Sequence, residues 1–467
     1  MCCRRVLTAL VLLAAAALAP AGARAEAYPW VDIHDDVRLV ADPYTDLEVR
    51  LYLISQARRS IDLALYEQGD DEVGLPVLAA LRQAADRGVK VRVITQWFFQ
   101  YLYHPLNQSP SYVTDPPTAV PIEYIVFGSP ASVVKHGWHP SDGVHGKVLI
   151  VDDAWALTTG RGHAAMNLRW IDSSNLLKGE LVRQVAEAFG KLWELARLSA
   201  DVIRPALPRV ELSEQQRDVH VPPSARHPDG PWRRQLDELI RWMHAPSRPD
   251  GVARRGRLLH TDFVAQMTAL RRQGKNPRTW DERLGVIQDP VLDALETRLA
   301  RTGPGSQVRF TSMYAVLHPR VKAAVCGAAQ RGAVVTMLTN GDYESPPIST
   351  LAWFAAIRDL DEVVRCGVSL HTFRRVKGLP WNFTHLKLVV VDDTTYFGSH
   401  NLNLASTLAN DELFVEVDDP GLAAESRAFF DHVLRESAEK APRADMEAAR
   451  PLGGIGRRIL DPVLGFW

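Results

Sequence analysis

The chain has 467 residues, which is enough for two domains or for one large duplicated domain. Hydrophobic residues make up 46% and charged residues 23%, a globular balance that excludes global disorder and a coiled coil. The formal net charge is -1, so the chain lacks the overall basic excess typical of nonspecific nucleic-acid binders, although a local basic groove is not excluded.

The N-terminus has the order of a secretory signal. Arg4 and Arg5 precede an apolar run, and the small-residue stretch Ala23-Arg24-Ala25 follows it. We expect cleavage after Ala25, export to the periplasm or the exterior, and no remaining membrane span. The alternative is a retained anchor, but the run is shorter than the roughly 20 residues that a span needs. Cleavage takes three arginines from the 54 basic residues, which leaves 51 against 55 acidic ones and a net charge of -4.

Two cysteines remain in the mature chain, Cys326 and Cys366. In an oxidising compartment they can form a disulfide. Their spacing does not show whether they meet, and two buried thiols are the open alternative.

Strand and helix patterns alternate through the first half, which predicts βαβ units and an α/β fold. The expected strands are Ser60–Tyr66, Val89–Ile94, Ile122–Phe127 and Trp155–Thr158, with a short strand-like run between Val31 and Val40. The expected helices are Asp46–Arg59, Leu75–Arg87 and Leu181–Arg197.

The stretch from His145 to Asp153 combines a histidine and a lysine with an apolar run and aspartates. The apolar run predicts a buried strand. Since side chains alternate along a strand, His145 and Lys147 are expected on one face at its start. An imidazole beside an ammonium suits an anionic substrate.

A region rich in proline and arginine follows, from about residue 204, and is interpreted as a connection with helices at Arg233–Met243 and Asp262–Arg272. Strands at Val308–Thr311 and Ala333–Thr339 then flank a helix at Arg320–Arg331.

The second half repeats the first. Residues 328–339 match residues 84–95 at six of twelve positions, an offset of 244, and His385-Leu386-Lys387 repeats the His-x-Lys pattern at an offset of 240. Two ordered matches at nearly equal offset indicate duplication. The two halves are therefore expected to meet at a pseudo-twofold axis, each with one histidine and one lysine.

Two imidazoles and two ammonium groups suit the cleavage of a phosphodiester. The lysines neutralise the phosphate oxygens, one imidazole attacks phosphorus to form a phosphohistidine, and the other exchanges protons with the alcohols. No metal or cofactor is required, because Lys147 and Lys387 supply the positive charge.

A nucleophilic imidazole needs a carboxylate on its other nitrogen to fix its tautomer. Asp172 follows His145 by 27 residues, and Glu412 follows His385 by 27 residues, so they are the candidate orienting carboxylates, one within each half.

The remaining candidates lie around the two apolar runs. Asp152 and Asp392, at the far ends, are expected to be structural. In Gly398-Ser399-His400-Asn401, the side chains of Ser399 and Asn401 are candidate phosphate ligands, and Gly160 is the corresponding candidate in the first half.

These motifs resemble those of the phospholipase D superfamily, and in particular of its bacterial cardiolipin synthase-like members. The motifs are His145-x-Lys147-x4-Asp152 and His385-x-Lys387-x4-Asp392, with Gly398-Ser399-His400-Asn401 and Asn410-Asp411-Glu412. The resemblance covers about residues 46–190 and 289–435. It departs at Thr159-Gly160-Arg161-Gly162, where those members have Gly-Gly-Arg-Asn.

The resemblance implies a duplicated two-lobed α/β fold, each lobe a mixed sheet flanked by helices, with the site between the lobes. It also implies a phosphohistidine mechanism, with His145 as nucleophile and His385 as acid/base; the reverse assignment stays open. The expected organisation is a signal at 1–25, the two halves at 26–203 and 289–440, a connection at 204–288 and a tail at 441–467.

Other chemistries have less support. His136, His139, Asp142 and His145 form a candidate zinc cluster, but no similar cluster precedes His385. A nucleophile-elbow serine hydrolase needs Gly-x-Ser-x-Gly, which the chain lacks.

The expected substrate is a phospholipid at a membrane surface, because of the export signal, the acidic mature charge and the aromatic run at residues 97–103. That run is either a lip for lipid tails or a packed wall. An exported nuclease and a non-catalytic binding protein are the alternatives, the latter because of the missing asparagine. The sequence does not separate hydrolysis from transfer.

Overall fold

The computed structural model describes most of the chain. The described residues are 26–97, 118–130, 134, 142–199, 224, 229–246, 251–314, 316–340, 359–373 and 381–440. The expected signal, the tail and most of the aromatic run lie outside these residues. Trp97, which the structure does describe, packs against the hydrophobic core of the first half.

The first half is built on a seven-stranded mixed sheet. In spatial order its strands are β3 (Val37–Val40), β11 (Ser174–Lys178), β9 (Trp155–Thr159), β8 (Val148–Val151), β4 (Ser60–Ala64), β5 (Lys90–Gln96) and β6 (Glu123–Phe127). β4, β5 and β6 run parallel, as the predicted βαβ unit requires, and β8 lies antiparallel to β4. β8 is buried on both faces, in keeping with its continuous apolar run.

The second half has a ten-stranded sheet within the described residues. Its main strands, in spatial order, are β12 (Arg255–His260), β20 (Leu413–Asp418), β18 (Thr394–Gly398), β17 (Leu388–Val391), β13 (Gln307–Thr311), β14 (Val334–Asn340) and β15 (Ser369–Phe373). Short strands extend its two edges: β1 (Glu26–Ala27), β2 (Val31–Asp32) and β21 (Ala438–Lys440).

The two sheets have the same order of equivalent strands, which confirms the duplicated two-lobed α/β fold. β12 takes the place of β3, β20 of β11, β18 of β9, β17 of β8 and β13 to β15 of β4 to β6. Directions agree as well, because β13, β14 and β15 run parallel and β17 is antiparallel to β13.

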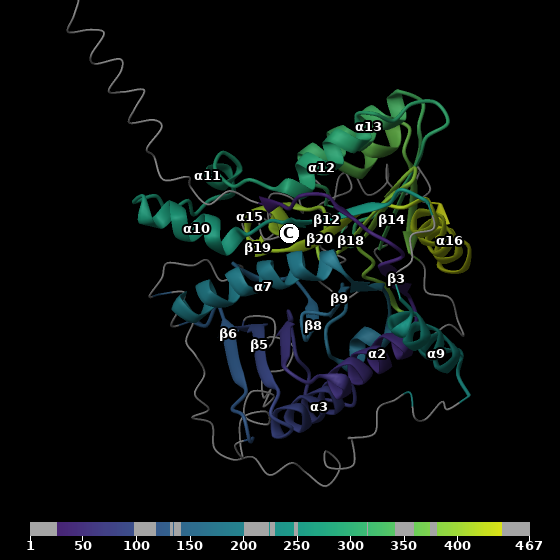
Figure 1. Ribbon diagram of the computed structural model, residues 1–467. Coiled ribbons are helices and arrows are strands. Elements are labelled where there is room, and N and C mark those ends of the chain that lie inside the picture. The colour runs from purple at the N-terminus through teal and green to yellow at the C-terminus, as the bar shows by residue number, and fades with distance from the viewer. Residues whose placement is uncertain are drawn as a thin grey trace, which may run out of the picture.

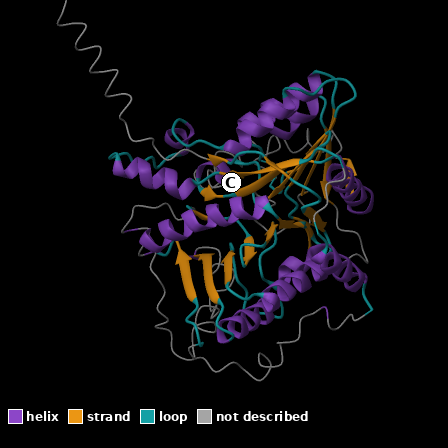
Figure 2. Ribbon diagram, viewed as in Figure 1, coloured by secondary structure: helices purple, strands orange, loops and turns teal. Residues whose placement is uncertain are grey.

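Helices form three layers around the two sheets (Figures 1 and 2). The outer face of the first sheet is covered by α2 (Pro43–Gln56), α3 (Gly74–Asp86) and α9 (Pro231–His244). The central layer contains α7 (Glu180–Ser199) and α16 (Pro420–Ser437), which share one hydrophobic core with both sheets. The outer face of the second sheet is covered by α12 (Pro290–Leu299) and α13 (Pro319–Gln330).

The predicted connection contributes to both lobes. Its helices are present as α9 and α10 (Phe263–Arg272), and a short helix, α11 (Trp280–Leu284), follows. The sequence analysis missed β12, which lies between α9 and α10 and joins the second sheet. The second lobe therefore recruits residues well before position 289.

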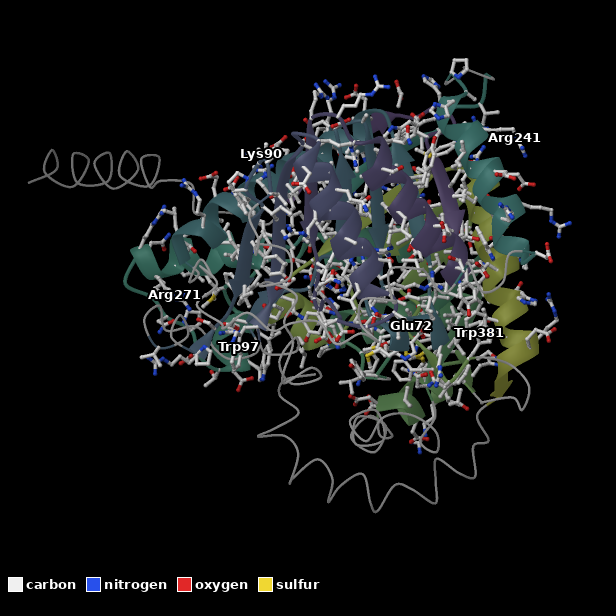
Figure 3. All side chains as sticks on the ribbon, turned by 90° about the horizontal axis from the view of Figure 1, so that it is seen from below. Glu72, Lys90, Trp97, Arg241, Arg271 and Trp381 are labelled. Carbon is white, nitrogen blue, oxygen red and sulfur yellow. A yellow bond between two sulfur atoms is a disulfide. The ribbon has the colours of Figure 1, made fainter. Side chains whose placement is uncertain are left out.

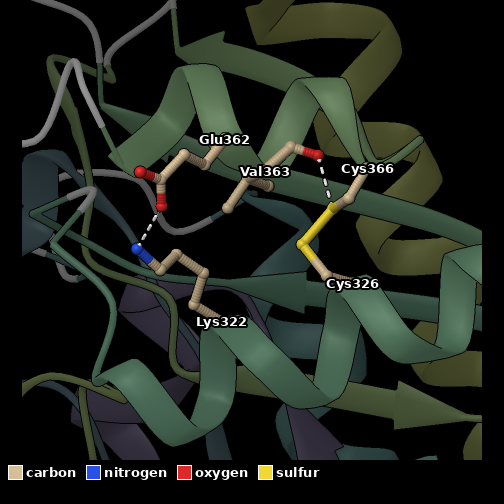
Figure 4. Close-up of a disulfide and its surroundings, with 5 residues drawn as sticks. All are labelled: Lys322, Cys326, Glu362, Val363 and Cys366. Carbon is tan, nitrogen blue, oxygen red and sulfur yellow. Dashed lines mark hydrogen bonds and ion pairs between the residues drawn. A yellow bond between two sulfur atoms is a disulfide. The ribbon is translucent and has the colours of Figure 1, made fainter.

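Cys326 and Cys366 form a disulfide, with their Cα atoms 5.3 Å apart (Figure 4). The bond joins α13 to the turn directly after the helical residues 359–365, which carry Glu362. Lys322 on α13 donates to Glu362 at 2.6 Å beside it. Of the two alternatives left open by the sequence, the structure has the disulfide.

No helix of the described residues has both the length and the apolar character needed to cross a membrane.

Candidate active site

Two short parallel ladders join the lobes at the site. β7 (Gly143–Val144) pairs with β19 (Asn410–Asp411), so that the residues next in register are His145 and Glu412. β10 (Trp170–Ile171) pairs with β16 (Phe383–Thr384), which aligns Asp172 with His385 in the same way. The backbone N–H of His145 donates to Asp411 O at 3.0 Å, and that of His385 donates to Ile171 O at 2.8 Å. The ladders thus set each histidine against a carboxylate of the other lobe.

The side chains complete these pairs. His145 Nδ1 lies 2.9 Å from Glu412 Oε2, and His385 Nδ1 lies 2.7 Å from Asp172 Oδ2. The equal spacing of 27 residues predicted a carboxylate from the same half for each histidine. That pairing is wrong: the same four residues meet, but with partners exchanged, because strands that end at the interface pair with the opposite lobe.

The two lysines lie beside their histidines. β8 begins at Val148 and β17 at Leu388, so both His-x-Lys segments precede the strands on which they were predicted. Lys147 Nζ donates to His145 O and Lys387 Nζ to His385 O, each at 2.9 Å. Lys387 Nζ also lies 3.0 Å from His385 Nε2.

Burial controls the charge of all four groups. Burial lowers the pKa of Lys147 to about 7, and the nearby Lys387 ammonium adds to the shift. Burial also lowers the pKa of Lys387 to about 8, against the attraction of Asp172 and Glu412. The two buried ammonium groups are therefore destabilised by the loss of solvating water. An anionic ligand would stabilise their charged forms.

The histidines are neutral near pH 7. Burial lowers the pKa of His145 to about 4; Glu412 opposes this shift and Lys147 adds to it. Burial and the Lys387 ammonium lower the pKa of His385 to about 3. In each neutral ring the Nδ1–H donates to a carboxylate, which leaves the lone pair on Nε2. Both rings are thus prepared to attack phosphorus or to accept a proton.

Aromatic rings enclose the histidines, a feature that the sequence analysis missed. The Tyr66 ring meets the His145 ring edge-on, with centroids 4.6 Å apart, and Lys147 Nζ lies 4.9 Å from the centre of the same ring. Trp170 lies 4.8 Å from His385, measured between ring centroids. Tyr66 lies at the end of a predicted strand, and its sequence position does not indicate that its ring contacts His145. Only the fold shows this contact.

Gly160 gives room to the carboxylate of Asp172. A Cβ atom at position 160 would collide with both carboxylate oxygens of Asp172, so only glycine fits there. The backbone N–H of Gly160 donates to Ser173 O. Its role as a phosphate ligand stays a prediction, while its close approach to Asp172 is a structural requirement of the His385 pair.

Ser399 and Asn401 lie in the equivalent turn of the second half. The Ser399 hydroxyl donates to Leu413 O at 3.2 Å and accepts from Leu413 N at 3.1 Å, so a phosphate contact would replace a backbone bond. Asn401 is buried, and its backbone N–H donates to Ser406 Oγ. Phosphate binding by both side chains stays a prediction.

Asp152 and Asp392 bind backbone at the start of neighbouring strands. The carboxylate of Asp152 accepts from the amides of Arg58, Arg59 and Ser60. Burial raises the pKa of Asp152, but these bonds outweigh it and lower the pKa below its usual value. Asp392 accepts from the amide of Gln307 in the same way. Both aspartates therefore stabilise the backbone, which agrees with the structural role expected for them.

The zinc cluster proposed from the sequence is described only in part. His136 and His139 lie outside the described residues, whereas both carboxylate oxygens of Asp142 bind Arg283, at 2.6 and 3.0 Å. The described residues contain one other group that has the donor atoms for a metal ion, His260, Asp262 and Asp411.

The site lies beyond the carboxyl ends of the parallel strands, because Tyr66, which contacts His145, follows the end of β4. In Figure 3, Lys90, where β5 begins, lies on the opposite side of the molecule from Trp97, which follows the end of β5. Glu72, in the loop that carries Tyr66, and Trp381, just before β16, lie on the same side of the molecule as Trp97. Ligands of open α/β sheets bind at this edge.

Comparison with known proteins agrees with this geometry. The family model described as "Cardiolipin synthase, PLD-like domain" matches residues 51–193 and 298–434. Cardiolipin synthase A of Pseudomonas aeruginosa is 25% identical over 449 residues, which cover 92% of this chain and 73% of that protein. The crystal structure of phosphatidylserine synthase from Haemophilus influenzae superposes with a TM-score of 0.63 at 13% identity, over 94% of this chain and 96% of that chain. That structure has the same fold.

Proposed function

Because this chain belongs to the cardiolipin synthase, phospholipase D-like domain family, we propose that it is an enzyme that cleaves or transfers the phosphodiester of a phospholipid. The observation that carries the proposal is the pair of buried histidines, each with a carboxylate on Nδ1 and a lysine beside it. A scaffold protein has no need to bury two such pairs at one interface, since each buried charge weakens folding unless it is compensated.

In the first step, His145 Nε2 attacks phosphorus while the bond from phosphorus to the leaving alcohol breaks. His385 is neutral in the free enzyme and takes up a proton from solvent when the anionic substrate offsets the charge of Lys387. It then gives this Nε2 proton to the departing oxygen. Lys147 and Lys387 neutralise the phosphate oxygens, on which charge builds up in the transition state. The positive charge that forms on the His145 ring is stabilised by Glu412.

In the second step, an incoming hydroxyl group gives its proton to His385 and attacks phosphorus. The bond between phosphorus and His145 Nε2 then breaks, which returns both histidines to their starting states. Water as acceptor gives hydrolysis, and a lipid alcohol gives transfer. The two outcomes share every step up to the phosphohistidine and differ only in the acceptor.

A lipid is the preferred substrate because the curated relative is named for cardiolipin synthesis and because the mature chain is acidic. Purified protein is incubated with phosphatidylglycerol vesicles, phosphatidylcholine vesicles or DNA, with and without glycerol, and the products are separated. We expect turnover of at least one lipid. Cleavage of DNA alone identifies a nuclease, and no turnover of any diester identifies a non-catalytic protein.

The covalent step has its own test. With phosphorus-labelled phosphatidyl-p-nitrophenol, whose leaving group departs without a proton, His385→Asn is expected to accumulate labelled protein, since it lacks the group that activates the acceptor. His145→Asn is expected to give neither label nor product. Label in His145→Asn but not in His385→Asn would reverse the roles of the two histidines.

Export completes the proposal. The disulfide between Cys326 and Cys366 supports it, because such bonds persist in oxidising compartments. N-terminal sequencing of the protein recovered from the periplasm or the medium is expected to begin at Glu26. An intact N-terminus in the membrane fraction would indicate a retained anchor.

A further inference from the structure

The two halves of the site differ at one equivalent position. β18 ends at Gly398 and β9 ends at Thr159. Three residues beyond these ends stand Asn401 in the second half and Gly162 in the first. The second half therefore places an amide where the first half has no side chain.

Glu67 occupies that space in the first half. A Cβ atom at Gly162 would lie 3.1 Å from Glu67 Cγ, 3.2 Å from Asn167 Oδ1 and 3.4 Å from Glu67 O, so a side chain there would press on both residues. Glu67 stands three residues beyond the end of β4, and the equivalent residue beyond β13 is Tyr314. The first half thus combines glutamate with glycine where the second combines tyrosine with asparagine.

The side chain of Glu67 is almost entirely buried, and its carboxyl group has no bonded partner among the described residues. The residue is 5% exposed. Among the residues that the structure describes, none donates a hydrogen bond to its carboxyl group or forms an ion pair with it. A nearly buried carboxyl group without a partner is costly, and its oxygens keep some solvent contact, so a ligand can reach them and complete their bonding. The site needs no further anion of its own, because Asp172 and Glu412 already orient the histidines.

Charged groups face Glu67 from each neighbouring segment. Burial raises its pKa to about 7, against the Lys147 ammonium and together with the Asp71 carboxylate. The backbone N–H of His163 donates to Glu67 O. The His163 ring is held between Gln68 Oε1, at 2.9 Å from Nδ1, and a guanidinium nitrogen of Arg50, at 2.6 Å from Nε2.

That arrangement keeps His163 uncharged. Burial and the Arg50 guanidinium hold the pKa of His163 well below its usual value. The groups that set the charge of Glu67 are therefore Lys147 and Asp71.

We propose that Glu67 is a substrate-contacting residue that replaces the missing asparagine and donates a hydrogen bond from its protonated carboxyl group to a phosphodiester oxygen. The inference rests on the proposed function and adds a specific contact to it. The ionised carboxylate would instead repel the phosphate and pair with Lys147. Substrate binding thus selects the protonated form and weakens as Glu67 ionises.

Three variants test the donor. Glu67→Gln keeps a donor at every pH, Glu67→Met keeps the length without a donor, and Glu67→Ala with Gly162→Asn moves the amide to its position in the second half. KM and kcat are measured from pH 6 to pH 8 with water-soluble dihexanoyl phosphatidylglycerol. Binding of diethyl phosphate, which keeps one charge over this range, is followed by NMR and requires no turnover.

At pH 6 we expect Glu67→Gln to match the wild type in KM and Glu67→Met to raise KM about tenfold, the effect of one hydrogen bond to a charged group. The ratio of wild-type KM to Glu67→Gln KM should rise between pH 6 and pH 8. The double variant should bind better than Glu67→Ala alone. The Glu67 charge also raises the pKa of Lys147, so Glu67→Gln favours loss of the Lys147 proton. That side effect would raise the KM of Glu67→Gln at high pH, which is opposite to the expected change in the ratio.

The outcomes separate the two proposals. Equal KM for Glu67→Gln and Glu67→Met at pH 6 would overturn the role of Glu67 even if lipid turnover is normal. If no lipid is turned over, the proposed function fails. Tighter diethyl phosphate binding by Glu67→Gln than by Glu67→Met would still support the contact, and equal binding would refute it.

Discussion

His145 Nδ1 lies 2.9 Å from Glu412 Oε2, although 267 positions separate the two residues in the chain. The His385 and Asp172 pair mirrors it across 213 positions. Each histidine is therefore oriented by a carboxylate of the other lobe, and neither lobe contains a complete pair. The chemistry of the site depends on the docking of the lobes through the β7–β19 and β10–β16 ladders.

The exchanged pairs predict separate effects for the two carboxylates. In Glu412→Gln the amide no longer stabilises the positive ring that forms when His145 bonds to phosphorus. We expect the rate of phosphohistidine formation to fall about a hundredfold or more, measured in a single turnover with labelled lipid. In Asp172→Asn the loss should fall mainly on the proton transfers of His385, so that labelled adduct persists longer.

A surface carboxylate provides the matched control. Glu194 on α7 is 60% exposed in its side chain and pairs with Arg197, so Glu194→Gln should change neither step. If Glu412→Gln prolonged the adduct and Asp172→Asn prevented its formation, the roles assigned to His145 and His385 would be reversed. Normal rates in both variants would refute orientation by carboxylates altogether.

Much of the fold could be predicted because each half carries its own periodicity. The expected strand Ser60–Tyr66 appears as β4, and the expected helix Leu181–Arg197 appears as α7. The repeat of His-x-Lys before two apolar runs identified both buried histidine and lysine pairs. These features are local patterns, which hydrophobic alternation and turn residues express in the sequence.

The exchange of carboxylates could not be predicted, because spacing along the chain carries no information about which lobe a strand end pairs with. Glu412 lies closer to His385 in sequence, yet the register of β19 on β7 brings it to His145. The strand β12 was missed for a similar reason. Its residues, Arg255 to His260, include two arginines, a glycine and a histidine, and only pairing with β20 on one side and with β1 and β2 on the other makes them a strand.

The lysines predict an alkaline loss of kcat/KM. Lys147 and Lys387 must be protonated to hold the phosphate, and burial lowers the pKa values of these side chains to about 7 and about 8. In the free enzyme their charge is present at low pH and is lost as pH rises through these values. We therefore expect kcat/KM to fall above pH 7, while kcat falls only at higher pH because bound phosphate raises both pKa values.

This experiment is best done in the Glu67→Gln background, so that Glu67 does not titrate in the same range. Lys387→Arg keeps a permanent charge at one of the two positions. In this variant only Lys147 still loses a proton, so the alkaline limb of the kcat/KM profile should have the slope of one ionisation instead of two. A profile that stays flat to pH 9 would contradict the assignment of phosphate binding to the two lysines.

Chelation should leave activity unchanged, since the lysines supply the charge that a metal would otherwise provide. The measurement is lipid turnover before and after dialysis against EDTA, with calcium-saturated EDTA as the control. His260, Asp262 and Asp411 make the test informative, because these three buried side chains have donor atoms close enough to share a metal ion. Loss of activity that added metal restores would show that a metal is required.

The disulfide predicts a stability that depends on redox conditions. Cys326 and Cys366 close a loop with a sequence separation of 40 residues. Loop closure of this size stabilises the folded state by about 3–4 kcal/mol, mainly by restricting the unfolded chain. Reduction, or the double change Cys326→Ser and Cys366→Ser, should lower the urea midpoint of the second lobe, followed by a probe in that lobe.

Activity below the unfolding transition should be unaffected, because the disulfide joins α13 to the turn after residues 359–365 on the outer face of the second sheet (Figure 4). The histidines lie at the lobe interface instead. The double serine variant should not respond to dithiothreitol, which separates loss of this bond from other effects of the reductant. If the wild type and the variant had the same urea midpoint under oxidising conditions, the two cysteines would be free thiols in the folded protein.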